Sequence, residues 1–317
     1  MVALFSALLA AYAAWSHNFW LLVSATVIAG YYSANGQLYR FAAAELAADG
    51  FKEKAVSLVL AGGLIGAIVG PNLASRTRTL YEVPFLGAYM ALGIVAILAM
   101  VCMAFIRFPA VPAKKPGDSA GRPLSEIMRQ PIFIVAAAAA ALSYGVMNLL
   151  MAATPLAMQV CGFSFDDAAL VLEWHVIGMF APGFFTGRLI KKFGALRVMG
   201  VGVLFNLACI AVALAGVALG HFVIALFLLG VGWNFLFTGS TTLALRAWTA
   251  EEKDRGQAAI NFLVFATMAL TSFASGALVT TQGWGLLNAG SLLPVALTAA
   301  ALLWLAAVEK SPPPQTA

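Results

Sequence analysis

The sequence predicts an all-α membrane protein, and three observations point to that class. Of its 317 residues, 62% are hydrophobic and only 10% are charged, whereas soluble domains average about 45–50% and about 25%. The apolar residues gather into ten long segments with short polar links between them. These segments contain unbroken runs such as VAAAAAALSYGVMNLL, which exclude a transmembrane β-barrel because barrel strands alternate apolar and polar residues.

A membrane-spanning helix requires about 20 mainly apolar residues. We assign one helix to each apolar segment; the ten are 1–15, 19–41, 55–74, 83–106, 131–156, 168–187, 196–218, 221–246, 256–280 and 286–308. The one long link, 107–130, is rich in Pro, Gly and Lys, which is typical of a connector. The predicted domains are an incomplete helical half over 1–106 with four spans, a cytoplasmic connector over 107–130, a six-helix half over 131–308 and a cytoplasmic tail over 309–317.

The basic residues of the links predict on which side of the membrane each link lies. Fifteen Lys and Arg residues fall on one side of the predicted bundle, and only Arg76 and Arg78 fall on the other. Cytoplasmic loops are enriched in Lys and Arg. We therefore place the fifteen, and with them both chain termini, in the cytoplasm. A multi-pass protein of this kind is expected in the cytoplasmic (inner) membrane of a bacterium.

The composition disfavours several classes of function. The net charge of +5 is carried by the loops, so it predicts no nucleic-acid partner. The three cysteines, Cys102, Cys161 and Cys209, are scattered without the spacing of a metal site, and so are the three histidines. The sequence contains no Gly-x-x-x-x-Gly-Lys-[Ser/Thr] loop for the phosphates of ATP. We predict no metal, no cofactor and no enzymatic activity.

The third segment, 55–74, carries a row of glycines. Gly62, Gly66 and Gly70 recur every four residues, so they share one helix face, and Pro71 follows them. Such a face lets a neighbouring backbone approach closely. The row is either a static packing groove or a functional feature, namely a hinge or a seal against proton leak.

A short pattern occurs twice, six predicted helices apart. Arg-x-x-x-Ala-Glu ends the second segment with Arg40 and Glu45, and it ends the eighth with Arg246 and Glu251. A pattern repeated at matched places indicates an internal duplication. These residues form either a cytoplasmic gate of Arg–Glu pairs or ordinary solvated loop charges.

The link after the sixth segment is a basic loop, GRLIKKFGALRVM, which ends at Met199. It resembles the Gly-x-x-x-Asp-Arg-x-Gly-Arg-Arg loop of the major facilitator superfamily of transporters, with Lys191 where the family usually has Asp. The positions that it keeps are Gly187, Lys192, Gly194 and Arg197. The paired Arg-x-x-x-Ala-Glu patterns resemble the cytoplasmic ends of that family's fourth and tenth helices. The glycine row resembles part of its fifth-helix motif, except that Ala74 and Ser75 replace the final glycine pair.

The resemblance extends over essentially the whole chain and implies two pseudo-symmetric helical halves. It leaves two interpretations of the basic loop. Arg188, Lys191, Lys192 and Arg197 are either anchors at the membrane interface or a latch on helix C-termini, whose dipoles attract cations. A latch would hold one conformation of a two-state transporter.

Polar residues inside apolar spans are candidates for function, because placing them in lipid is costly. Three segments carry such residues at helical spacing, together with aromatic or Met side chains. They are Tyr32, Asn35 and Tyr39; Tyr144, Met147, Asn148 and Met151; and Trp233, Asn234, Phe237 and Thr241. The resemblance implies that these three segments line a central cavity. We predict that the side chains bind an amphipathic or aromatic solute; the alternative is hydrogen bonding and packing between helices.

Two titratable side chains lie well inside a span. Counted from Asp166 at the outer end of segment 168–187, Glu173 lies about 10 Å into the membrane at 1.5 Å per residue. His175 follows two residues later. Both are candidates for proton coupling; the alternatives for Glu173 are a side chain that extends back to the interface or a structural pair.

The sequence therefore predicts a monomeric secondary transporter in the lipid bilayer, which moves a small organic solute, a drug or a metabolite, by alternating access. Protons are a candidate coupling ion, and efflux and uptake are both open. The alternative is a truncated, non-transporting membrane fragment or scaffold. Four spans precede the connector and six follow it, and the first segment has only about fifteen residues, so we expect the family's first two helices to be absent.

Overall fold

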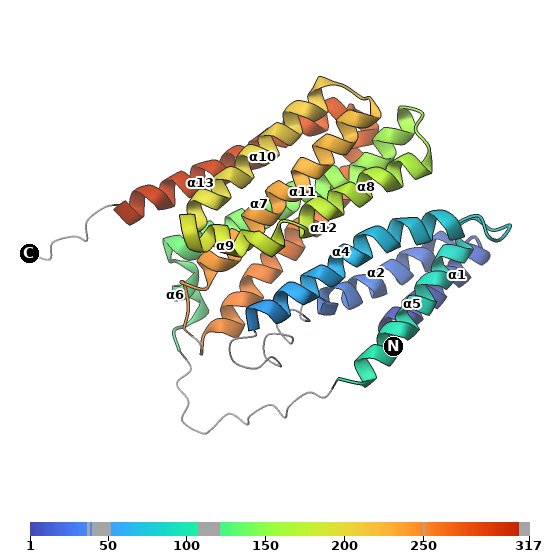
Figure 1. Cartoon of the computed structure of the whole chain (residues 1–317), viewed down its shortest axis with the longest axis horizontal. Helices are drawn as coiled ribbons and strands as arrows, with labels where there is room; N and C mark the ends of the chain where they lie inside the picture. Colours follow the sequence, from blue (N-terminus) through green and yellow to red (C-terminus); the bar gives the residue numbers. More distant parts are fainter. Residues whose placement is uncertain (37–38, 40–51, 107–120, 250, 311–317) are drawn as a thin grey trace, which may run out of the picture. The chain divides into compact units, whose positions relative to one another are not determined.

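We describe a computed structural model of the chain, covering residues 1–36, 39, 52–106, 121–249 and 251–310 (Figure 1). Its secondary structure over those residues is helical, without strands. The chain divides into two compact units, residues 1–113 and 114–317. The division falls inside the Pro-rich link 107–130. Arg40 and Glu45, two residues of the predicted gate, lie outside the described residues.

The first unit contains four described helices: α1 (Val2–Trp15), α2 (Phe19–Gly36), α4 (Lys52–Thr77) and α5 (Leu86–Ala104). α1 packs against both α2 and α5, and α4 contacts α5. The buried face of α1 consists of small residues, and Ser6 on that face donates a hydrogen bond to the carbonyl of Ala25 at 3.0 Å. Small residues let helices approach closely, as expected where lipid removes the hydrophobic force between them.

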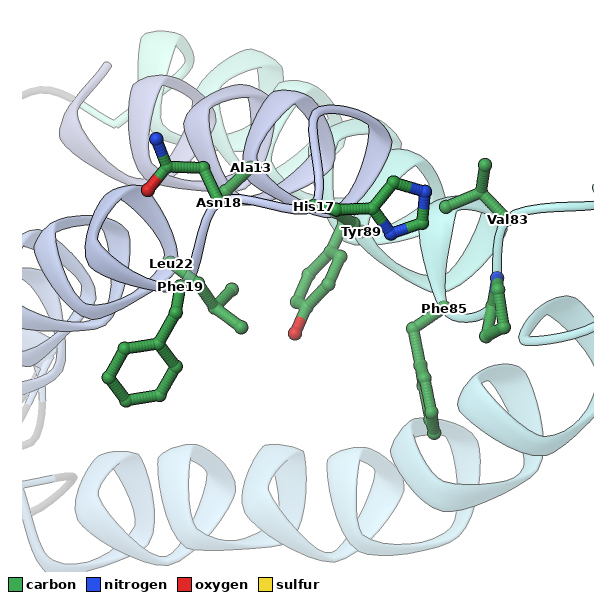
Figure 2. A pocket seen from close by; sticks show the side chains of 10 residues that line it. Ala13, His17, Asn18, Phe19, Leu22, Val83, Phe85 and Tyr89 are labelled. Carbon is green, nitrogen blue, oxygen red and sulfur yellow. The ribbon is translucent and has the colours of Figure 1, made fainter.

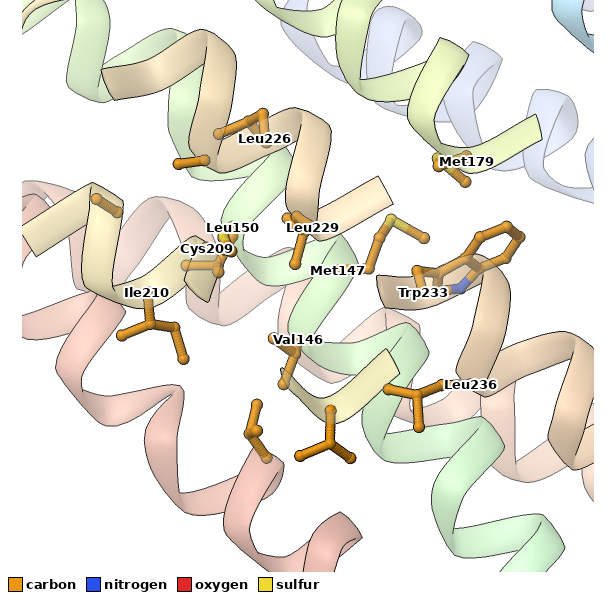
Figure 3. Close-up of a cluster of buried hydrophobic side chains, with 14 of the residues drawn as sticks. Val146, Met147, Leu150, Met179, Cys209, Ile210, Leu226, Leu229, Trp233 and Leu236 are labelled. Carbon is orange, nitrogen blue, oxygen red and sulfur yellow. The ribbon is translucent and has the colours of Figure 1, made fainter. Parts of the chain in front are cut away.

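The second unit is built around two long, buried helices. Its elements are α6 (Leu124–Met128), α7 (Pro131–Val160), α8 (Phe165–Phe180), α9 (Gly183–Phe193), α10 (Ala195–Ala215), α11 (Leu219–Ala244), α12 (Lys253–Gly290) and α13 (Leu292–Lys310). α7 packs against α11, α12 and α13, and α11 packs against α7, α8 and α10. Their buried side chains form one continuous core, part of which is drawn in Figure 3.

Two predicted segments differ in detail from the observed helices. Segment 168–187 is not one continuous helix, because the helix is interrupted at Ala181 and Pro182, between α8 and α9. Proline lacks the amide hydrogen that would continue the ladder of hydrogen bonds. The predicted link between the last two segments is instead helical except at Gly283, whose φ of 77° kinks α12. Glycine adopts such an angle at little cost.

Six helical stretches among the described residues are long and apolar enough to cross a membrane. One combines α8 with α9, and another runs through α12 and α13 as 253–309. α1 is apolar but shorter, with 14 residues. The predicted count of ten spans and the orientation of the termini therefore stay predictions.

In the second unit, two glycines bring the backbones of α8 and α11 together. A Cβ added to Gly178 would lie 2.6 Å from the carbonyl oxygen of Phe227, and one added to Gly230 would clash with the carbonyl of His175. The two helices therefore touch backbone to backbone. By contrast, a Cβ at Gly62, Gly66 or Gly70 would meet no atom within 4 Å, so the predicted roles of that row in packing or as a hinge stay untested.

Candidate functional site

Four aromatic side chains from three helices meet in the second unit. Trp233 and Phe237, one turn apart on α11, stack with centroids 5.0 Å apart and planes 11° from parallel. Tyr144 of α7 stands edge-on to both, 5.4 Å from Trp233 and 5.5 Å from Phe237. Phe180, the last residue of α8, stands at 72° to Trp233 and 6.4 Å away. We call Tyr144, Phe180, Trp233 and Phe237 the aromatic cluster.

Trp233 is the most enclosed member of the aromatic cluster. Only 7% of its surface is exposed, and it belongs to the same buried cluster as Met147 of α7 and Met179 of α8 (Figure 3). Its indole Nε1 is buried and has no hydrogen-bond partner among the described residues. The other three rings are only half-buried. The structure thus brings together the predicted residues Tyr144, Met147, Trp233 and Phe237 in one buried region, in which the indole N–H of Trp233 makes no hydrogen bond to a described residue.

Asn148, another predicted cavity residue, ties α7 to α12. Its Nδ2 lies 2.8 Å from the Ser272 hydroxyl, 3.0 Å from the Thr271 hydroxyl and 3.1 Å from the Met268 carbonyl. One turn earlier, a Cβ on Gly145 would lie 2.7 Å from the Thr267 methyl group. Close approach and an interhelical hydrogen bond therefore act at the same contact.

Asn234 sits at the break between α8 and α9. Its Nδ2 donates to the carbonyl of Met179 at 2.7 Å, and its Oδ1 accepts from the Thr186 hydroxyl at 2.7 Å. Met179 is one of the last residues of α8, where a helix leaves carbonyls without partners. Asn234 thus satisfies the broken backbone inside the apolar bundle, where an unsatisfied group would be costly.

The remaining residues of the predicted stripes are placed as follows. Thr241 donates to the carbonyl of Phe237 in its own helix at 2.9 Å, and Met151 is a half-buried neighbour of the core. Tyr32, Asn35 and Tyr39 belong to the first unit and are exposed there, with Asn35 donating to the carbonyl of Tyr31 at 2.8 Å. Their predicted role at a shared cavity stays a prediction.

His175 and Glu173 occupy different faces of α8. His175 is fully buried, with its Nδ1 2.7 Å from the carbonyl of Leu226 on α11 and its Nε2 without a partner. It therefore ties α8 to α11 beside Gly230, where the two backbones meet. Glu173 is half-buried. A coupling role for either residue stays a prediction.

An ion pair between a half-buried arginine and a buried glutamate joins the connector to the loop between α11 and α12. Arg122 donates from Nε to one carboxylate oxygen of Glu252 at 2.9 Å and from Nη2 to the other at 2.8 Å. Its backbone N–H adds a third bond at 2.7 Å, and Nη2 also reaches the carbonyl of Ala247 at 3.1 Å. Thr249 donates its N–H to the same carboxylate at 3.1 Å. We call the Arg122–Glu252 pair the connector clasp.

The surroundings of the connector clasp fit it closely. Gly121 has a φ of 62°, and a Cβ there would lie 2.6 Å from the Glu252 Cγ. Ile127 of α6 is fully buried in a small cluster with Phe133 and Ala247. The bonds from Arg122, more than those from Thr249, hold the pKa of the Glu252 carboxyl at about 2, below its ordinary 4.5.

Sequence reasoning missed the connector clasp, because Arg122 and Glu252 are 130 residues apart and no local pattern links them. It pointed instead to Arg246 and Glu251. Arg246 pairs with Glu309 of α13 at 2.8 Å, and Glu251 is exposed. In this conformation the arginine of the repeated pattern thus contacts the end of the last helix.

The predicted basic loop is mostly helical, because Gly187–Phe193 belong to α9 and Ala195–Met199 belong to α10, with Gly194 alone between the two helices. Gly194 ends α9 with a φ of 88°, and the charged side chains before and after it are exposed. Lys192 lies over the ring of Phe193, with Nζ 5.2 Å from the centroid. The predicted motif residues that are exposed are Gly187, Arg188, Lys191, Lys192, Gly194 and Arg197.

The first unit has a hollow of about 410 Å³ that sequence reasoning did not predict. It lies where the α1–α2 turn faces the start of α5 and is lined by His17, Asn18, Phe85 and Tyr89, among others (Figure 2). His17 and Phe85 have φ angles of 51° and 65°. Positive φ is uncommon for residues other than glycine. The hollow is wide open, and it contains no cluster of titratable groups.

Comparisons with known proteins agree with this architecture. The family model of the Major Facilitator Superfamily matches the chain twice, over residues 1–181 and 138–317. The riboflavin transporter RfnT of Brucella anthropi is 40% identical over 274 residues, which are 86% of this chain and 69% of the relative. YddS of Bacillus subtilis, an MFS-type transporter, is 24% identical over 301 residues, 90% of this chain and 69% of its own length.

A solved structure shows the same fold. The E. coli fucose:proton symporter FucP superimposes with a TM-score of 0.63 at 16% identity, over 95% of this chain and 80% of FucP. The relatives are transporters, in line with the expectation that the chain is not an enzyme. Their bacterial origin indicates the cytoplasmic membrane. The chain is thus a multi-pass membrane protein of the major facilitator superfamily, as the order of its motifs predicted.

Proposed function

We propose that the protein is a secondary transporter of a planar, heteroaromatic solute such as riboflavin, and that it works by alternating access as a monomer in the bilayer. The observation that carries the proposal is the aromatic cluster, in a chain 40% identical to a riboflavin transporter. Ligand sites are mostly apolar, with a few well-placed polar groups. Offset and edge-on aromatic pairs each contribute about 0.5–1.5 kcal/mol beyond area burial.

The proposal is tested by uptake of radiolabelled riboflavin into proteoliposomes with an imposed pH gradient. Trp233→Ala should lower uptake about tenfold or more, because truncating a buried aromatic anchor typically costs at least 2 kcal/mol. Trp304→Ala is the matched control, since Trp304 of α13 is 46% exposed and far from the cluster in sequence. Riboflavin uptake by the wild type that is indistinguishable from empty liposomes would sink the substrate proposal.

We further propose coupling to protons, with Glu173 or His175 as the carrier. Glu173 is a half-buried carboxylate within an apolar span, a position usually reserved for function. In the same assay, Glu173→Gln should abolish gradient-driven accumulation yet permit exchange of labelled for unlabelled solute. Full accumulation by that variant would leave Glu173 with a structural role.

We propose ten spans with both termini in the cytoplasm, on the basis of the asymmetric distribution of Lys and Arg. Reporter fusions after Arg122 and after Phe163 lie on either side of α7, the helix Pro131–Val160. They should therefore report opposite sides, with the Arg122 fusion cytoplasmic. Both reporters on one side of the membrane would contradict the topology.

A further inference from the structure

The indole N–H of Trp233 is a hydrogen-bond donor without an acceptor among the residues that the structure describes. Tyr144, whose ring centroid lies 5.4 Å from that of Trp233, does not accept from this N–H either. Buried tryptophan N–H groups usually have a partner, because an unsatisfied donor is costly. Trp233 therefore favours any state of the protein in which an acceptor reaches Nε1.

No described side chain accepts a hydrogen bond from this N–H. Met147 and Met179, which belong to the same buried cluster as Trp233, carry thioether sulfurs, which are weak acceptors, and the rings of Phe180 and Phe237 carry no oxygen or nitrogen atom. The nearest amide on the same helix, Asn234, is already engaged by Met179 and Thr186. The acceptor is therefore expected from outside this set of side chains.

The rings around Trp233 constrain the shape of a ligand that brings the acceptor. An acceptor meets an indole N–H in the plane of the indole. The planes of Tyr144 and Phe180 stand at 82° and 72° to that plane. A flat ligand can therefore lie on one of these rings while an oxygen at its edge accepts the N–H.

We infer that Trp233 is the specificity-determining residue of the aromatic cluster, and that it selects flat heteroaromatic solutes bearing a ring carbonyl by donating its indole N–H to that oxygen. The inference deepens the proposed function and rests on it for the location of the site. It explains why an indole, rather than a ring without a polar edge, occupies the centre of the cluster. A site built to hydrogen-bond its substrate rejects analogues that lack the matching group.

The test is equilibrium binding to the purified full chain, measured by flavin fluorescence. The probes are riboflavin, lumichrome (the carbonyl-bearing ring without the ribityl chain) and the 2-thio and 4-thio forms of riboflavin. The variant replaces Trp233 with benzothienylalanine, which keeps the ring shape and exchanges N–H for sulfur. Trp233→Phe is the second variant, and the same replacement at exposed Trp304 is the control.

We expect the benzothienyl variant to bind riboflavin and lumichrome about five- to hundredfold more weakly than the wild type, the range that follows from an unmade buried hydrogen bond. One of the two thio forms should bind the wild type more weakly than riboflavin does. In the benzothienyl variant the same exchange of oxygen for sulfur should cause no further loss of affinity, because the hydrogen bond is already absent. The inference would be overturned if variant and wild type bound with equal affinity, or if the losses of affinity were fully additive. It would also be overturned if the wild type bound neither riboflavin nor lumichrome. Tight ring binding without riboflavin uptake would instead refute the proposed substrate alone.

Discussion

Replacing Gly230 with alanine is expected to destabilise the second unit more than any other single added methyl group discussed above. The new Cβ would clash with the carbonyl oxygen of His175 and lie 2.8 Å from the amide nitrogen of Met179. Both atoms belong to the backbone of α8, so no side-chain rotation relieves the overlap. Overpacking costs about 1–3 kcal/mol, which corresponds to a fall in melting temperature of about 2–12 °C for a unit of this size.

The measurement is thermal unfolding of the detergent-solubilised protein, followed by tryptophan fluorescence. Gly200→Ala in α10 is the matched control, because a Cβ there meets no atom within 4 Å. Alanine also has the higher helix propensity, so the control should keep or slightly raise the melting temperature. Equal melting temperatures for the two variants would show that α8 and α11 move apart easily, contrary to the backbone contact described above.

Much of the second unit could be predicted because helical spacing places side chains on faces. Trp233 and Phe237 are one turn apart, and they do share a face, on which both also meet Tyr144. The sequence could not decide what a polar residue in a span serves. Asn148 and Asn234 are both buried amides, yet they have different roles. Asn148 joins α7 to α12 by hydrogen bonds, whereas Asn234 donates a hydrogen bond to a backbone carbonyl near the end of α8. Only tertiary neighbours separate such roles.

The differences from these predictions have physical causes that can be named. Pro182 lies inside segment 168–187, and the residues on both sides of it are apolar. Apolar composition predicts a span but does not show where a proline, which lacks the amide hydrogen, interrupts the helix. The repeated pattern contains Glu251 but not its neighbour Glu252. A carboxylate's burial depends on a partner such as Arg122, which arrives from a distant loop.

Replacing Arg122 should destabilise the protein more than removing the charge of Glu252. The Glu252 side chain is 2% exposed and that of Arg122 is 37% exposed. If Glu252→Gln breaks the pair, the guanidinium can turn toward water. If Arg122→Met breaks it, a buried carboxylate keeps only the Thr249 N–H, and an uncompensated buried charge is strongly destabilising. Thermal unfolding should therefore rank wild type above Glu252→Gln above Arg122→Met.

The pH dependence gives an independent check on the connector clasp. The pKa of the Glu252 carboxyl is about 2 in the folded protein against an ordinary 4.5. The stability that this depression contributes is complete above pH 4.5 and is lost as pH falls toward 2. Arg122→Met should remove that acid-sensitive part, whereas Arg129→Met, which changes an exposed arginine of the same connector, should keep it. An Arg122→Met variant with the wild-type pH profile would mean that the clasp does not hold the connector to the α11–α12 loop in solution.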